Sequence, residues 1–532
     1  MTGLAAVWLL PGQDNGDPDR TKGISQLFST REAPLPSQFC MPLTAGDAEA
    51  VITTAEDIAR EAAADDEARA RRKARQAERQ RRREEDRERK AAEQAERERV
   101  RRAEAERLRT GAEEARRVLL RKARLLRDAA GGSIRDCFEG LPEHRDPRGM
   151  RHPLPAVLAL VVLAMLHGKT KLVAITCWIA HAGQDALEQA GARHRGEDGL
   201  LAPPSPKTVT RCLGQAGAQA LSDRVCGYLS AAVPQEPPAF PVSGPALQPQ
   251  VACDGKMARG ALRGDGTPLF ILSAAAVGPL NGAAGAVVIA DREIPAKTNE
   301  IPEMSPMLLG LNDRFPLAGK ILTADALHTQ DGFAELARVR LGAHFVLCAK
   351  KNRKNLYAAL EALCWAGAAR HVTKDTGHGR EETRSHLAMD APKEIKALIP
   401  HVEQVAKVHR VRTVRHWKGD GRTWRLVTTT TRETVYLVTS LTSREAGPEH
   451  IAAYIRAHWG IENEVHWVRD ATLREDESKV RAQNRPRNLA TLRNLLAGLC
   501  RQLGLGDIAA AIRAAEYDKD LLTAITRLIT AP

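Results

Sequence analysis

The sequence has 532 residues and lacks several features that would assign it to a class of protein. Its longest apolar run, VLALVVLAMLH from Val157, falls well short of the roughly 20 residues that a membrane-spanning helix requires. The first 20 residues contain neither the basic segment nor the small-residue cleavage site of a secretory signal. We therefore expect a soluble, cytoplasmic protein with no membrane partner.

Paired cysteines are also missing. The nine cysteines are scattered singly, with no C-x-x-C spacing and no dense framework. That distribution argues against a zinc ribbon and against a scaffold held by disulfides. Most of these thiols are expected to lie in the core as small apolar side chains.

Positive charge, by contrast, is abundant. The formal net charge is +13 and the isoelectric point is about 9.4, which predicts a polyanionic partner, with nucleic acid as the first candidate. Residues 57–128 contain 25 Lys and Arg against 18 Asp and Glu, an excess of 7 that is more than half of the total. The rest of the chain is only mildly basic.

Changes in composition divide the chain into five segments. Residues 1–54 are expected to form a loosely ordered tail. Residues 55–130 are rich in Ala, Arg and Glu but carry no sustained apolar seam, which predicts a charged single helix or a weak coiled coil. Apolar residues at helical spacing predict a helical domain over 131–235, a candidate for DNA binding, and a Pro-rich linker follows at 236–249. The last segment covers 250–532.

The last segment changes from helical to strand-like spacing. Apolar runs such as PLFILSAAAVG, GAVVIADREI, GKILTADALH and AHFVLCAK predict strands, and QDGFAELARVRLG predicts a helix between the last two. This alternation indicates an α/β fold with a mixed sheet. Alternating Thr-rich and Arg-rich stretches predict an inserted β-rich region at about 366–447, after which helices resume.

Two acidic residues stand where predicted strands end. Asp254 closes VACD and Asp325 closes ILTAD, and a small residue follows each one. Ends of adjacent strands are where α/β folds place their chemistry, because side chains there project from a rigid scaffold. Either aspartate could instead be a turn residue, since Asp-Gly is a common turn sequence.

The stretch HWGIENEVHWVRD carries the third candidate carboxylate. At helical spacing His458, Glu462 and His466 share one face, so the segment is either an amphipathic core helix with a polar edge or a site. A zinc site on this face is disfavoured, because no H-E-x-x-H motif or cysteine accompanies it. We favour a core position for Trp459 and Trp467 over a role as base-stacking platforms.

A trio of Asp254, Asp325 and Glu462 would offer only oxygen ligands. Such a set suits Mg²⁺ or Mn²⁺ better than zinc. Two such ions can activate a water or a 3′-hydroxyl on one side of a phosphodiester and stabilise the leaving oxygen on the other. The chemistry predicted for this trio is therefore phosphoryl transfer on nucleic acid.

Five ordered motifs resemble those of bacterial insertion-sequence transposases of the ISAs group, which includes the H-repeat-associated proteins. They are DGKMARGA, KTNEIPEMSPMLLGL, ILTADALHTQ, GAHFVLCAKKNRKNLY and the long block that begins IRAHWGIENEVHWVRD. Upstream, DPRGMRHPLPAVLALVVLAMLHGKTKLVAI and PPSPKTVTRCL are similar to the helical domain that precedes the catalytic domain in this group. The resemblance covers roughly residues 133–505 and leaves the first 130 outside it.

The resemblance implies an RNase H-like fold in which Asp254, Asp325 and Glu462 form a DDE triad that binds Mg²⁺ or Mn²⁺, as two ions. It also implies cleavage of DNA at the element ends and strand transfer into target DNA, by a homodimer or higher oligomer that pairs the two ends. Two alternatives are a transposase-derived DNA-binding protein that is catalytically silent and an interaction protein organised by the charged helix.

The helix that carries Glu462 departs from the wider superfamily, in which Tyr, Arg, Glu and Lys stand at fixed offsets. Here these positions hold Ile455, His458, Glu462 and Arg469, so only the glutamate is kept and Arg469 is a candidate cationic substitute. Side chains near the predicted site are candidates for contact with DNA. They are Lys256, Lys297, Asn299, Gln330, Lys350, Lys351, His458 and Arg469.

Overall fold

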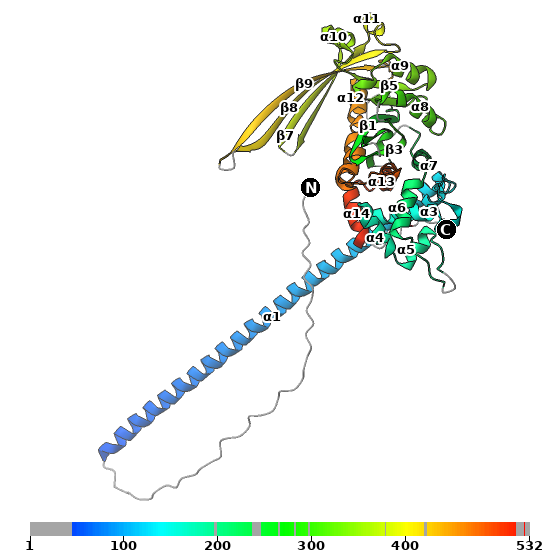
Figure 1. The fold of residues 1–532 in the computed structure, drawn as a ribbon. Coiled ribbons are helices and arrows are strands. Elements are labelled where there is room, and N and C mark those ends of the chain that lie inside the picture. The colour runs from blue at the N-terminus through cyan, green and yellow to red at the C-terminus, as the bar shows by residue number, and fades with distance from the viewer. Residues whose placement is uncertain are drawn as a thin grey trace. The chain divides into compact units, whose positions relative to one another are not determined.

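The computed structural model describes residues 45–532, apart from 196–198, 237–245, 264–265, 281–282, 296–297, 378, 420–422, 518–525 and 527–532 (Figure 1). Most of the predicted N-terminal tail, most of the Pro-rich linker and Lys297 lie outside the described residues. The chain divides into two compact units, Met1–Glu104 and Ala105–Pro532.

Helix α1 (Ala45–Ala130) is built from the Ala, Arg and Glu that favour helices, and it begins ten residues before the start that composition predicts. Along the part of α1 that belongs to the first unit, every described side chain is exposed, from Arg60 onward. The last turns differ, because Ala123 and Leu126 are buried in the hydrophobic core of the second unit. The helix is therefore a solvated rod for most of its length and a core element at its end.

The rest of the helical region packs around α3 (Leu154–Leu166), which is apolar on all sides and buried along nearly its whole length. Ser205 begins α6 by accepting a hydrogen bond from the backbone N–H of Thr208, as its Ser-Pro sequence predicts. The other helices of this region are short. They are α2 (Ile134–Cys137), η1 (Pro147–Gly149), α4 (Leu172–Ala180), α5 (Gln184–Ala190), α6 (Pro206–Gln215) and α7 (Ala218–Ala231).

In the part of the chain that the structure describes, nine strands form one mixed sheet in the order β3-β2-β1-β4-β5-β9-β8-β7-β6. The first three strands are antiparallel, β4 and β5 are parallel to β1, and β9 to β6 are antiparallel again. This confirms the predicted mixed α/β sheet. Its strands are β1 (Gln250–Leu262), β2 (Pro268–Leu280), β3 (Ala283–Glu293), β4 (Ile321–Ala324), β5 (His344–Ala349), β6 (Ala369–Gly377), β7 (Arg380–Asp390), β8 (Gln404–Gly419) and β9 (Trp424–Thr439).

The predicted β-rich region at about 366–447 contains β6 to β9, which continue the same sheet beyond β5. Whether this region is an insertion remains a prediction. The helices that follow β3 are α8 (Ile301–Asn312), η2 (Ala326–His328), α9 (Asp331–Glu335), η3 (Leu336–Arg340), α10 (Lys354–Ala362), α11 (Lys393–Lys396), α12 (Pro448–His458), η4 (Ile461–His466), η5 (Val468–Thr472), α13 (Arg485–Gln502) and α14 (Ile508–Tyr517). No described helix is both long enough and apolar enough to cross a membrane.

The two faces of the sheet are covered by different helices. On one face Val251 and Cys253 join the core that includes Met304 and Leu308 of α8. On the other, Ala252 packs in a cluster with Ile461 and Val465 of η4. Because successive side chains of a strand point to opposite faces, β1 presents Asp254 to the side that η4 covers.

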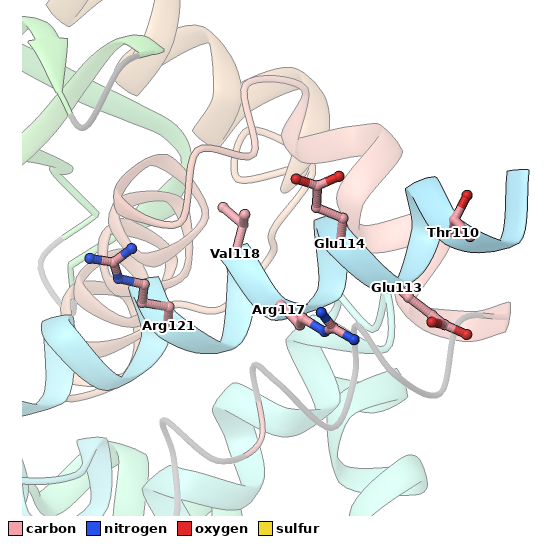
Figure 2. A pocket seen from close by; sticks show the side chains of 6 residues that line it. All are labelled: Thr110, Glu113, Glu114, Arg117, Val118 and Arg121. Atoms are coloured by element: carbon pink, nitrogen blue, oxygen red, sulfur yellow. The ribbon is translucent and has the colours of Figure 1, made fainter. Parts of the chain in front are cut away.

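Helix α1 also bears a surface recess that six of its own side chains line (Figure 2). All six come from one helix and all six are exposed, so the recess does not enclose a site. They are Thr110, Glu113, Glu114, Arg117, Val118 and Arg121.

Candidate active site

The two aspartates stand side by side on neighbouring parallel strands. Cys253 of β1 pairs with Ala324 of β4, and each aspartate is the next residue of its strand, so their backbones lie about 5 Å apart. Asp325 follows the last residue of β4, as predicted. Asp254 does not end a strand, because β1 continues to Leu262 by pairing with β2. What ends after Cys253 is the pairing with β4, and this opens the sheet beside Asp254.

Glu462 reaches the same place from the helix that covers this face. It belongs to η4, a stretch of π-helix, which is a rare geometry that is frequent at functional sites. Partial desolvation raises the pKa of Glu462, and the charge of Asp254 raises it further. Both aspartates also act on His458, whose pKa burial nevertheless lowers. Asp254 thus acts electrostatically on Glu462, and both aspartates act on His458.

The two histidines of this helix contact the edge of the trio. His466 Nδ1 lies 3.3 Å from Asp254 Oδ2, and His458 Nδ1 lies 3.1 Å from the hydroxyl of Thr323. Within the described part of the chain, the spacing of ligand atoms does not group His458, Glu462 and His466 as a metal site. Each histidine instead contacts β1 or β4 beside an aspartate.

A second acidic side chain lies close to Asp325. Glu300, Asp325 and His328 each offer a ligand atom within 4.8 Å of the others, a spacing that could hold a metal ion. His328 is buried, and its Nε2 lies 3.1 Å from Glu300 Oε2. The carboxyl of Glu300 packs against Gly255, where a Cβ atom would collide with it. The carboxyl of Glu300 can occupy this space, next to the residue that follows Asp254, because glycine has no Cβ atom.

Sequence reasoning gave Glu300 no role, and the only signal was its place in the motif KTNEIPE. Among the described residues, the spacing of ligand atoms groups Glu300, Asp325 and His328, and it does not group Asp254 or Glu462 with them. Oxygen-rich sets of this kind fit Mg²⁺ or Mn²⁺. The absence of a Cβ at residue 255 is consistent with a crowded ligand set, so the residues present fit such an ion.

Two of the candidate DNA contacts are exposed beside the site. Lys350 and Lys351 follow β5, and both are exposed. The positive charge of Lys350 lowers the pKa of Glu462, partly offsetting the rise caused by desolvation. A cation in this position could meet a phosphate that approaches Glu462.

Two other candidates are buried, which the sequence did not indicate. Lys256 is 6% exposed, and its ammonium group lies 2.6 Å from the carboxyl of Asp470. Arg469 is completely buried and lies 2.7 Å from Glu475. Neither cation is accessible to DNA in this structure, and we correct the expectation that Arg469 replaces the lysine of the superfamily pattern as an accessible group.

The remaining candidates make local contacts. Asn299 Oδ1 accepts a hydrogen bond from the backbone N–H of Ile301, and Gln330 Nε2 donates one to the backbone oxygen of Leu327. The predicted core position of Trp459 and Trp467 is wrong, because their side chains are 52% and 61% exposed. Ile461 and Val465 occupy the sheet-facing side of this segment instead.

Two regions of the sequence match known protein families. Residues 274–499 match the family described as the transposase DDE domain, and residues 135–229 match the DDE_Tnp_1-associated family. The first match includes Asp325 and Glu462 and begins after Asp254. These matches confirm the resemblance to the transposases of the ISAs group.

Similar proteins carry the same kind of name. The protein named "Putative transposase YncI" of Escherichia coli O157:H7 is 25% identical over 377 residues, which cover 69% of this chain and 87% of that protein. The "H repeat-associated putative transposase YhhI" of Escherichia coli K12 is 24% identical over 254 residues, 45% of this chain and 62% of that one. A solved piggyBac transposase synaptic complex with hairpin DNA has 11% identity and a TM-score of 0.33 over 78% of this chain and 82% of that one, which is too low a similarity to support an argument.

Proposed function

We propose that this transposase cleaves DNA at the ends of its insertion sequence and joins them to target DNA, with Mg²⁺ or Mn²⁺ as cofactor. Strands β1 to β5 would be the RNase H-like core, supported by three antiparallel strands followed by two that are parallel to the first. The catalytic trio would be Asp254, Asp325 and Glu462. The observation that supports the proposal is that Asp254 and Asp325 follow the paired residues Cys253 and Ala324, and that η4, which carries Glu462, covers the face to which Asp254 points.

Each side chain would have a separate task. Asp254, Asp325 and Glu462 would hold the ions, with Glu300 as a fourth carboxylate. When bound, the ions supply activation of the attacking oxygen and stabilisation of the leaving one. His466 would fix the rotamer of Asp254, and Lys350 would hold a phosphate near Glu462. The DNA partners would be the element ends and the target, paired by at least two copies of the chain.

The first test is cleavage of a plasmid that carries the element and its flanking DNA, with Mg²⁺, Mn²⁺ or EDTA. Replacing Glu462→Gln keeps the shape and removes a charged ligand. We expect the rate to fall by roughly a thousandfold, which corresponds to the loss of several kcal/mol of transition-state stabilisation. Glu464→Gln is the matched control, because Glu464 lies two residues away and pairs with Arg501.

The outcomes are distinct. Metal-dependent cuts at the element ends that disappear in Glu462→Gln and persist in Glu464→Gln would support the proposal. Sequence-specific binding by the wild type without cleavage would favour a silent DNA-binding protein.

Glu300 is tested by binding and not by activity. We expect Glu300→Gln to weaken Mn²⁺ binding by about tenfold in calorimetry, because replacing a ligand or its supporting group typically costs ten- to a hundredfold. Glu303→Gln is the control, since Glu303 lies on the same helix and pairs with Arg292 at 2.9 Å. Equal affinities for wild type and Glu300→Gln would remove Glu300 from the site and leave the trio untouched.

A further inference from the structure

The outer half of the β8 and β9 pair extends beyond its neighbours in the sheet. The last pair between β7 and β8 is Arg380 with Val414, and β5 contacts β9 only from Tyr436 onward. The backbone N–H of Arg415 still donates to the backbone oxygen of Gly379, and beyond it residues 416–419 and 424–427 pair only with each other. Figure 1 shows this ribbon projecting from the rest of the sheet. We call residues 411–419 and 424–432 the distal ribbon.

The distal ribbon carries an unbalanced positive charge. It has five Lys and Arg and no Asp or Glu. Lys418 stands directly opposite Arg425, an arrangement that destabilises a strand pair. Arg384 and Arg410, nearer the sheet, share the carboxyl of Glu382. Among the described residues, the pairing of Arg415 with Glu381 at 3.7 Å is the outermost ion pair, and none is found for the cations nearer the tip.

Large apolar side chains gather on one face of the same segment. Trp417 is paired with Leu426, and Trp424 with Gly419, so all of them share a face of the ribbon. The side chains of Trp417, Trp424 and Leu426 are 64%, 62% and 56% exposed. The ring of Trp424 lies against Gly419, where a Cβ atom would be only 2.9 Å from it. The ribbon therefore presents two tryptophans on one face and, on the other, Lys418 and Arg425, for which no carboxylate partner is found among the described residues.

We propose that the distal ribbon is a DNA-binding arm separate from the carboxylate site. Its cations would bind backbone phosphates, and Trp417 and Trp424 would stack on unpaired bases, an interaction that tolerates any sequence. The inference rests on the proposed function, because it takes DNA as the substrate. It adds a surface that the trio does not require.

A second copy of the chain is the other occupant that the geometry allows. The edge of β9 over residues 424–435 is unpaired and could add a strand. The charge distribution argues against it, because each distal ribbon would bring five cations to the interface and none of its residues 411–419 and 424–432 is Asp or Glu. Charged side chains on an exposed edge are also a common device against strand addition. The phosphates of DNA would instead neutralise these cations.

The test measures the binding of the full-length protein to labelled DNA in EDTA, so that no cleavage is needed. One variant combines Lys418→Gln with Arg425→Gln, and a second combines Trp417→Ala with Trp424→Ala. The matched control combines Arg81→Gln with Arg82→Gln, which removes the same charge from exposed positions of α1. Duplex DNA and duplex DNA with a single-stranded overhang are titrated at several salt concentrations.

We expect the cation variant to bind about tenfold more weakly and to lower the slope of log affinity against log salt by about 2, because each of the two removed cations neutralises about one phosphate. The tryptophan variant should bind the overhang about tenfold more weakly and the duplex almost as well as the wild type, because stacking needs open bases. The α1 control should bind like the wild type. All variants should keep the wild-type melting temperature, since the replaced side chains are exposed.

Three results would overturn the inference. Ribbon variants that bind both DNAs like the wild type would exclude the arm while leaving the cleavage proposal intact. An oligomeric state that changes in the variants without DNA, at unchanged DNA affinity, would assign the ribbon to an interface between copies. A wild-type protein that binds neither DNA would contradict the arm and the proposed function together.

Discussion

Arginine and glutamate pair in two regions of this molecule under opposite conditions. Along α1 the ion pairs join residues three or four positions apart, and their side chains are 55–81% exposed. Behind the candidate site, Glu475 lies between Arg469 and Arg493, and all three are at most 2% exposed. The same residue types are thus a solvated surface in one region and a core in the other.

The difference decides what each pair contributes. Exposed helical pairs contribute about 0.3–0.5 kcal/mol each, because water already solvates both charges. A buried charge has no such alternative, so removing its partner leaves an uncompensated ion. The buried cluster connects Arg469 of η5 to Arg493 of α13, and η5 continues the segment that carries Glu462. Net charge counted along the sequence draws attention to α1, whereas the contacts that hold the site lie elsewhere.

The largest effect predicted from this comparison is that of Glu475→Gln. It leaves two buried guanidinium groups with one neutral partner, so we expect the free energy of unfolding to fall by about 3–5 kcal/mol. Urea unfolding of the full chain, followed by tryptophan fluorescence, measures the change. Glu477→Gln, at an exposed glutamate two residues away, is the control. A decrease below about 1 kcal/mol would show that the buried cluster contributes no more than a surface pair.

The same cluster predicts a dependence of stability on pH. Burial alone would raise the pKa of Glu475, but Arg469 and Arg493 together hold it below its usual value. A pKa lowered by folding stabilises the protein above the unfolded-state value of about 4.5, and this stability is lost as the pH falls through the lower folded-state value. Between pH 6 and pH 3 the wild type should therefore lose more stability than Glu475→Gln. Parallel urea midpoints for the two proteins would contradict this.

The smallest effect is predicted for α1. Arg102→Gln breaks the ion pair with Glu98, in which the two side chains are 80% and 61% exposed. We expect the free energy of unfolding to change by less than about 0.5 kcal/mol and the helical circular dichroism signal to stay the same. A decrease above about 1 kcal/mol would mean that α1 is stabilised by contacts of another kind, such as pairing with a second helix.

The sequence predicted the parts of the fold that depend on local pattern. Composition predicted the long helix, and apolar runs predicted the mixed sheet. Asp254 and Asp325 were expected close together because both follow strand-like runs. Glu300 could not be found in this way, because its position depends on the chain before α8 folding back onto Gly255, a contact between segments 45 residues apart.

The exposure of two cations and of two tryptophans was also predicted wrongly. Lys256 and Arg469 were expected at the surface because isolated cations usually are, and only their contacts with Asp470 and Glu475 explain their burial. Trp459 and Trp467 were assigned to the core by residue type. The apolar stripe of Ile461, Val465 and Val468 faces the interior instead, and helical spacing puts both tryptophans on other sides of the segment.

The identity of residue 255 could help to identify inactive copies of such a gene from their sequences. Any side chain at this position would push Glu300 out of place while leaving Asp254, Asp325 and Glu462 unaltered in the sequence. If Glu300 serves the site as proposed, such a copy would be inactive although its three acids are all present. Surveys that distinguish active insertion sequences from inactive copies should therefore check the glycine after the first aspartate together with the three acids.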